Sequence, residues 1–71
     1  MLRKHSIIIS GHASSVSLEP EFWDELRLIA DRLGLSINQL VSQIDSDRTG
    51  NLSSSIRVYV FNDMRSRIAG V

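Results

Sequence analysis

The stretch from Ser14 to Ser36, SSVSLEPEFWDELRLIADRLGLS, sets the order of elements that decides the fold. Up to Leu18 it alternates polar and apolar side chains with a period of two, as in a half-buried β-strand. Pro20 suits the first turn of a helix, where its missing N–H is not needed. Apolar residues then recur every three or four positions until Gly34, a typical helix end. The pattern predicts a strand followed by a helix over residues 20–33.

A second helix is predicted over residues 36–47. The sequence from Ser36 to Gln39 matches a capping box, in which the Ser36 hydroxyl accepts from the Gln39 amide and the Gln39 side chain accepts from the Ser36 N–H. Apolar residues follow at the spacing of one helix face, namely Ile37, Leu40, Val41 and Ile44.

The segment 52–68 is compatible with two kinds of secondary structure. Residues 56–61 favour a strand by propensity. They also belong to a longer array with helical spacing, Leu52, Ile56, Val60, Met64 and Ile68. The length of this array favours a helix, with Asn51 or Ser53 as its N-cap. Apolar residues on several faces then predict burial between subunits or against the first two helices.

Strand structure is predicted in the region 5–18, before the first helix. His5 to Ile9 is rich in β-branched residues, and the segment 10–13, which contains Gly11, is suited to a turn. A strand this short needs a partner strand. The partner comes either from the other segment, as a hairpin, or from another chain.

The 71 residues form one domain, 1–71, whose small core favours self-association. No cysteine is present to form a disulfide or a thiolate metal site. No apolar run is long enough to span a membrane, so a cytoplasmic protein is expected. His5 and His12 lack the further ligands that a structural metal site requires, so neither a metal nor another cofactor is expected.

The formal net charge of the chain is zero, which gives no overall attraction to nucleic acid. The charges are nevertheless unevenly placed. Residues 1–18 contain Arg3 and Lys4 but no acid, whereas residues 19–25 contain four acids and no base. Such asymmetry can produce a local positive face, although solvated chain ends give the same pattern.

Catalysis is not expected. The chain has no nucleophile-elbow motif and is too short to enclose a substrate pocket of about 300 Å³ or more. Phe22 and Trp23 fall at helical spacing with Leu26, which is more typical of core anchors than of a platform for stacking bases.

Four motifs together resemble the ribbon-helix-helix family of bacterial DNA-binding proteins, and in particular a short bacterial subgroup. The resemblance covers nearly the whole chain. It implies a mainly α fold, with N-terminal β-strand(s) followed by two to three helices, in an intertwined homodimer. The two chains would pair their strands into an antiparallel ribbon that enters the DNA major groove. The motifs are RKHS at 3–6, GH at 11–12, SLEPEFW at 17–23 and GNLSS at 50–54.

The same resemblance implies roles for residues of the ribbon. Val16 and Leu18 would point into the core, which leaves Ala13, Ser15 and Ser17 to face base edges. Family members usually place a long polar or basic residue in this ribbon, and Ala13 departs from that habit. Contacts to the DNA backbone would come from Arg3, Lys4 and His5.

Phosphate binding is implied at the amino end of the family's second helix, where free N–H groups and the helix dipole favour an anion. Ser36, Ile37 and Asn38 occupy that position. The sequence from Asn51 to Arg57 also resembles the start of the family's second helix, which would make 36–47 an insertion. In that case Asn51, Leu52 and Ser53 would take the phosphate role.

Two functions follow as hypotheses. In the first, the protein is a transcriptional regulator that binds DNA as a homodimer or a tetramer. In the second, the same fold serves as a protein-interaction and dimerisation module with little or no DNA binding. The exposed surface of 51–71 would then hold a protein partner, as antitoxins of this family hold toxins.

Overall fold

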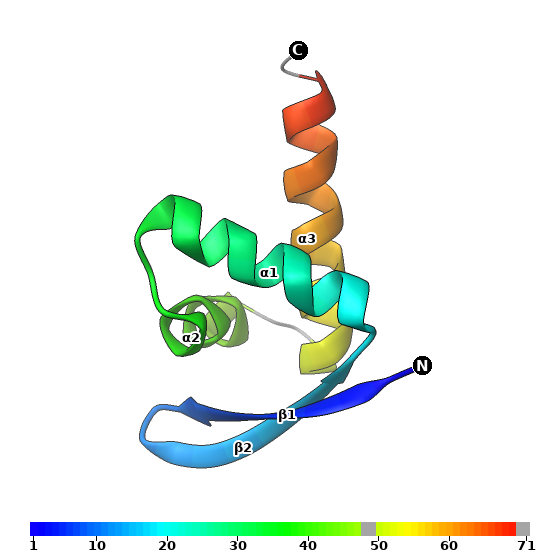
Figure 1. Cartoon of the computed structure of the whole chain (residues 1–71). Coiled ribbons are helices and arrows are strands. Elements are labelled where there is room, and N and C mark those ends of the chain that lie inside the picture. The colour runs from blue at the N-terminus through cyan, green and yellow to red at the C-terminus, as the bar shows by residue number, and fades with distance from the viewer. Residues whose placement is uncertain (48–49, 70–71) are drawn as a thin grey trace.

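Two strands and three helices follow one another in the computed structural model, which describes residues 1–47 and 50–69. The hairpin of β1 and β2 lies beneath the helices in Figure 1, and α3 runs away from it, past α1. The expected mainly α fold with N-terminal strands is confirmed. The segment 52–68, whose sequence was compatible with a strand or a helix, is helical. The elements are β1 (Arg3–Ile9), β2 (His12–Leu18), α1 (Pro20–Leu33), α2 (Ile37–Asp47) and α3 (Leu52–Ala69).

The hairpin is built within one chain. β1 and β2 pair antiparallel, from Arg3 opposite Leu18 to Ile9 opposite His12. The connecting residues Ser10 and Gly11 have φ angles of 52° and 79°. Positive φ at both central residues is what a type I′ turn requires, and the twist of that turn matches the twist of two paired strands.

This pairing decides between the two sources of a partner strand that the sequence left open. The partner of β2 is β1 of the same chain, as in a hairpin. Strand pairing by itself therefore does not require a second copy. β1 also begins at Arg3 rather than at residue 5, because Arg3 and Lys4 still have partners in β2.

The core lies between the inner face of the hairpin and the helices. Val16 and Leu18 point into it, as expected, and they are 3% and 0% exposed. All five elements contribute to this single cluster, so each helix helps to fix the position of the hairpin. The other buried residues are Ile7, Leu26, Ile29, Ala30, Leu40, Val41, Ile44, Ile56 and Val60.

The caps explain where the helices begin and end. Gly34 adopts the left-handed conformation, with φ of 71°, and ends α1. The predicted capping box is present, because the Ser36 N–H donates to Gln39 Oε1 at 2.8 Å and the Gln39 N–H donates to Ser36 Oγ at 3.1 Å. At α3 the Ser54 N–H donates to Asn51 Oδ1 at 3.2 Å. Asn51, rather than Ser53, therefore caps α3.

Only one side of α3 is buried. Ile56 and Val60 are fully buried, whereas Met64 and Ile68 of the same predicted array are 39% and 73% exposed. The reason is geometric, because side chains spaced by four residues drift around a helix with 3.6 residues per turn. Within one chain, therefore, only part of the array is buried against the rest of the fold, and burial between subunits stays a prediction.

Ion pairs join the C-terminal half of α3 to α1. Asp63 of α3 pairs with Arg32 of α1, and Arg67 contacts Asp63 at 3.0 Å and Glu25 of α1 at 3.1 Å. The Arg32 guanidinium beside Asp63 lowers the pKa of this carboxyl. These side chains hold α3 to α1 in the part where α3 contributes no fully buried apolar residue.

Replacing Gly11 with alanine should destabilise the protein by about 1 kcal/mol, because an L-residue is strained in the left-handed conformation. No heavy atom lies within 4 Å of the added Cβ, so steric overlap would not contribute. Urea denaturation measures the effect. Gly50→Ala is the control, since Gly50 does not have a positive φ. Equal stability of the two variants would contradict the turn.

Stability should fall in acid partly because of Asp63. Its pKa is lower in the folded chain than in the unfolded chain, so its contribution is present at neutral pH and is lost as the pH falls through the folded value. Asp63→Asn should lower the melting temperature at neutral pH and flatten the acid part of the stability curve. Asp24→Asn, on the exposed side of α1, is the control. Parallel curves for Asp63→Asn and the unmodified protein would argue against this role.

Candidate nucleic-acid interface

One face of the hairpin points away from the helices. Residues directly opposite each other in an antiparallel pair lie on the same face, and successive pairs alternate between faces. Val16 and Leu18 are buried on the inner face, which also contains the pairs of Ile7 with Ser14 and of Ile9 with His12. The alternate pairs form the outer face, namely Lys4 with Ser17, Ser6 with Ser15 and Ile8 with Ala13.

The chemistry of the outer face changes along the hairpin. Lys4 and Ser17 lie toward the open end, away from the turn, and the hydroxyl groups of Ser6 and Ser15 lie in the middle. Ile8 and Ala13 lie next to the turn, and Ile8 is 54% exposed. Serine hydroxyls both donate and accept, so this face can match several base edges. A two-stranded ribbon of this kind fits the DNA major groove.

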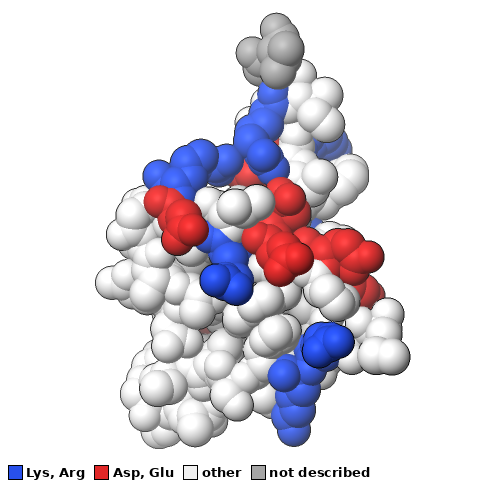
Figure 2. Space-filling model, viewed as in Figure 1, with Lys and Arg blue, Asp and Glu red and all other residues white. Residues whose placement is uncertain are grey.

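Charges on the molecule are segregated. The two strands contain Arg3 and Lys4 and no carboxylate. In Figure 2 the acidic side chains gather over α1, whereas only basic charges appear over the hairpin. Glu19 directly follows β2, and Arg57 of α3 contacts it at 2.9 Å. The hydrogen bond from Arg57 lowers the pKa of Glu19. The positive charge of Arg57 offsets the negative charge of this carboxylate, which is the first after the ribbon.

The three residues predicted to contact bases lie together, since Ala13, Ser15 and Ser17 all belong to the outer face. Lys4 joins them from β1. Sequence reasoning missed Ser6 and Ile8, because it assigned faces only along the second strand. The run of three isoleucines in β1 hides the alternation that would have revealed them.

His5 lies on the inner face, unlike its neighbour Lys4. Its ring stacks on Trp23 of α1, with 3.7 Å between the ring centroids and 5° between the planes. The Nε2 atom is buried and has no hydrogen-bond partner among residues 1–47 and 50–69. This position directs His5 away from the outer face. Trp23 packs against the core, as expected of an anchor.

The start of α2 lies beside β1. The backbone N–H of Ile8 donates to Asn38 Oδ1 at 3.2 Å, which ties the first turn of α2 to the edge of the hairpin. The Ser36 hydroxyl serves as the helix cap. The first turn of a helix leaves backbone N–H groups without a partner in the helix. In the described part of the chain, the backbone N–H groups of Ile37 and Asn38 are of this kind.

The alternative phosphate site at the start of α3 has a different setting. The Asn51 carboxamide caps the helix, and Leu52 and Ser53 are partly buried. No hydrogen bond between residues 51–53 and the hairpin is found among the residues that the structure describes. The first of the two predicted sites, residues 36–38, is therefore the one that is hydrogen-bonded to the ribbon.

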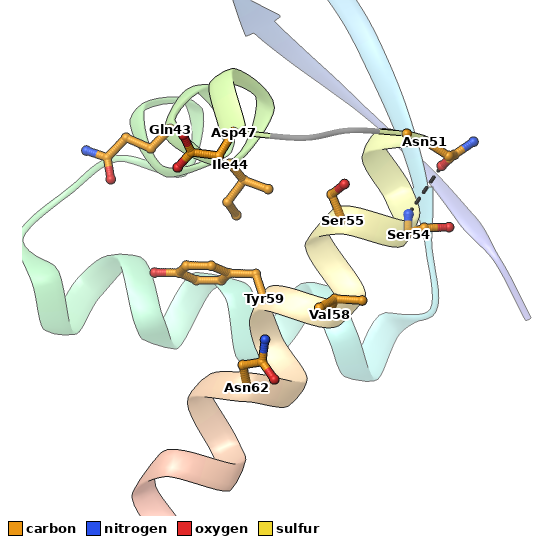
Figure 3. A pocket seen from close by; sticks show the side chains of 10 residues that line it. Gln43, Ile44, Asp47, Asn51, Ser54, Ser55, Val58, Tyr59 and Asn62 are labelled. Atoms are coloured by element: carbon orange, nitrogen blue, oxygen red, sulfur yellow. Dashed lines mark hydrogen bonds between the residues drawn. The ribbon is translucent and has the colours of Figure 1, made fainter.

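A groove separates α2 from α3, with a volume of about 520 Å³. In Figure 3 the ring of Tyr59 extends from α3 toward α2 and faces Ile44. None of the lining residues belongs to the hairpin, so the groove is not part of the outer face. Its lining consists of Gln43, Ile44, Asp47, Gly50, Asn51, Ser54, Ser55, Val58, Tyr59 and Asn62.

Residues 1–47 and 50–69 contain no group of three or more His, Asp or Glu side chains that could hold a metal ion. Among the same residues no helix is both long and apolar enough to cross a membrane.

Comparison with protein families gave one result. A family model described as "Ribbon-helix-helix domain" matches residues 2–64, which include the hairpin, α1, α2 and most of α3. No curated protein and no solved structure matched the chain.

Proposed function

Because the chain belongs to the ribbon-helix-helix family, we propose that it is a DNA-binding protein that regulates transcription. This fold is typical of DNA-binding regulators and of antitoxins. The main supporting observation is the outer face of the hairpin, which combines Lys4, serine hydroxyls and an apolar tip on two strands without a carboxylate.

In this proposal the outer face enters the major groove. Ser15 and Ser17 meet base edges, and Ala13 lies beside them. Lys4 of the outer face contacts phosphate, and so does Arg3, which alternates to the other face but is exposed at the open end of the hairpin. Phosphate contacts fix the position of the protein on the duplex, and base contacts supply sequence selectivity. His5 takes no part in DNA contact in this proposal, because it stacks on Trp23.

A second phosphate contact comes from the start of α2. The amides of Ile37 and Asn38 lie at the positive end of the helix dipole, where an anion is favoured. The bond from Ile8 to Asn38 holds this helix end at the edge of the ribbon. A groove wall beside the ribbon would therefore present its phosphates to residues 36–38 rather than to residues 51–53.

A second copy can extend the hairpin along β2. The Ile8 N–H donates to Asn38 and not to β2, so Ile8 and Ala13 form a non-hydrogen-bonded pair. By the same alternation, Ala13, Ser15 and Ser17 direct their backbone groups away from β1. This edge is available for a β2 strand of another chain, and family members typically bind DNA as dimers. The two central strands would then lie in the groove.

In such a sheet of four strands, the two β1 strands lie on the outside. Strands are about 4.8 Å apart, so the outer strands are separated by about 14 Å. The major groove is about 12 Å wide, which places the β1 strands over its walls. The long side chain of Lys4 would thus reach the phosphates from β1, and the serines of β2 would lie near the bases. Ile8, opposite Ala13 of β2, would face the groove beside those bases.

The double variant Arg3→Ala, Lys4→Ala should bind DNA at least ten-fold more weakly at low salt. The slope of log affinity against log salt should decrease by about 2 for each bound chain, because two phosphate contacts are lost. Fluorescence anisotropy with mixed genomic fragments measures both quantities. Arg27→Ala, an exposed arginine on α1, is the matched control. Failure of the unmodified protein to bind these fragments at low salt would overturn the proposed function.

A second candidate function is binding of another protein. The observation that favours it is the exposed apolar face of α3, where Val58, Phe61 and Ile68 are 58%, 56% and 73% exposed. Exposed apolar patches on small domains often mark interaction sites. Of the segment 51–71 predicted for this role, residues 70 and 71 lie outside the described residues.

Variants distinguish this second candidate from DNA binding. Phe61→Ser with Ile68→Ser should release a stoichiometric partner from the affinity-purified protein, because the apolar contact is lost, and should leave DNA affinity unchanged. The Arg3→Ala, Lys4→Ala variant should keep the partner. Pull-down after nuclease treatment, followed by mass spectrometry, measures the result. Recovery of the same partner with both variants would exclude the α3 face as its binding site.

A further inference from the structure

Near the turn, the outer face of the hairpin carries two apolar side chains beside its serines. Ile8 and Ala13 lie directly opposite each other beside the turn, and we call these two residues the tip patch. Ile8 is 54% exposed although Ile7, its neighbour, is 2% exposed. The side chain of Ile8 is therefore not part of the core and extends from the outer face.

The tip patch is held in a fixed position. The Ile8 backbone donates to Asn38 and not to Ala13, so the pair is of the non-hydrogen-bonded kind. In such pairs the Cα atoms lie about 4.5 Å apart, and the side chains are closer than in hydrogen-bonded pairs. The β-branched side chain of Ile8 also has few rotamers. Ile8 and Ala13 together present one small apolar surface, supported on one side by α2 and on the other by the turn.

We propose, on the premise that the outer face binds DNA, that the tip patch recognises the C5 methyl group of thymine. In the major groove thymine is the only standard base that presents a methyl group. The other bases present donors and acceptors, which an apolar surface would bury without partners. Ala13 is short and leaves space above the strand, while Ile8 beside it supplies a wall against which a methyl group can pack.

The position of this thymine follows from the strand geometry. Ser6 and Ser15 form the next pair on the outer face, two residues along each strand. Two residues of a strand span about 6.7 Å. Base pairs are stacked about 3.4 Å apart. Where the ribbon runs along the groove, the thymine should therefore lie about two base pairs from the pair that faces these serine hydroxyls.

The experiment begins with the selection of a binding site from a random duplex library, using the unmodified full chain. Each thymine of the selected site is then replaced in turn by deoxyuridine, which differs only in lacking the methyl group. We expect one thymine per hairpin whose replacement weakens binding about four-fold, as for the loss of one buried methyl group. Ile8→Ala should bind the thymine and deoxyuridine duplexes equally. Val58→Ala, an exposed apolar residue on α3, is the control and should keep the difference.

Ala13→Ser provides a second test, since it adds a hydroxyl group to the patch and should also reduce the preference for thymine. Circular dichroism would establish that both variants are folded, which is expected because both side chains are exposed. A selected site that is insensitive to every replacement, or a preference that Ile8→Ala leaves intact, would overturn the tip patch while leaving DNA binding in place. DNA binding without any selected site would likewise overturn the tip patch alone, whereas failure to bind any duplex at low salt would overturn the proposed function itself.

Discussion

The register of the hairpin is the constraint on which the rest of the molecule depends. Val16 and Leu18 are buried only because each pair of residues alternates between the two faces of the ribbon. A slip of one residue would turn these side chains to solvent and bring the serines into the core. The type I′ turn at Ser10 and Gly11 excludes such a slip, because it fixes which residues are opposite each other. Core packing and the composition of the outer face are thus two results of one register.

The helices could be predicted from the sequence because their signals are local. Pro20 marks a helix start because it has no N–H to leave unpaired, and Gly34 and the capping box at Ser36 mark helix ends through bonds within a few residues, which are present. The source of the second strand could not be predicted, because pairing within a chain and pairing between chains satisfy the same short-range pattern.

The candidate site was predictable to a smaller extent, for a related reason. The outward residues of β2 follow from its alternation, whereas β1 contains three consecutive isoleucines that define no face. The orientation of His5 and Ile8 depends on cross-strand register, which is a tertiary property. The hydrogen bond between Ile8 and Asn38 spans thirty residues of sequence, so no local sequence pattern predicts it.

The stacked pair of His5 and Trp23 gives the molecule an intrinsic optical probe. The chain has a single tryptophan, and its ring lies flat against a residue of β1. Its emission therefore reports whether the hairpin is seated on α1, without any attached label. Detachment of the strands at an early stage of unfolding would be visible as a change in fluorescence before the helical signal declines.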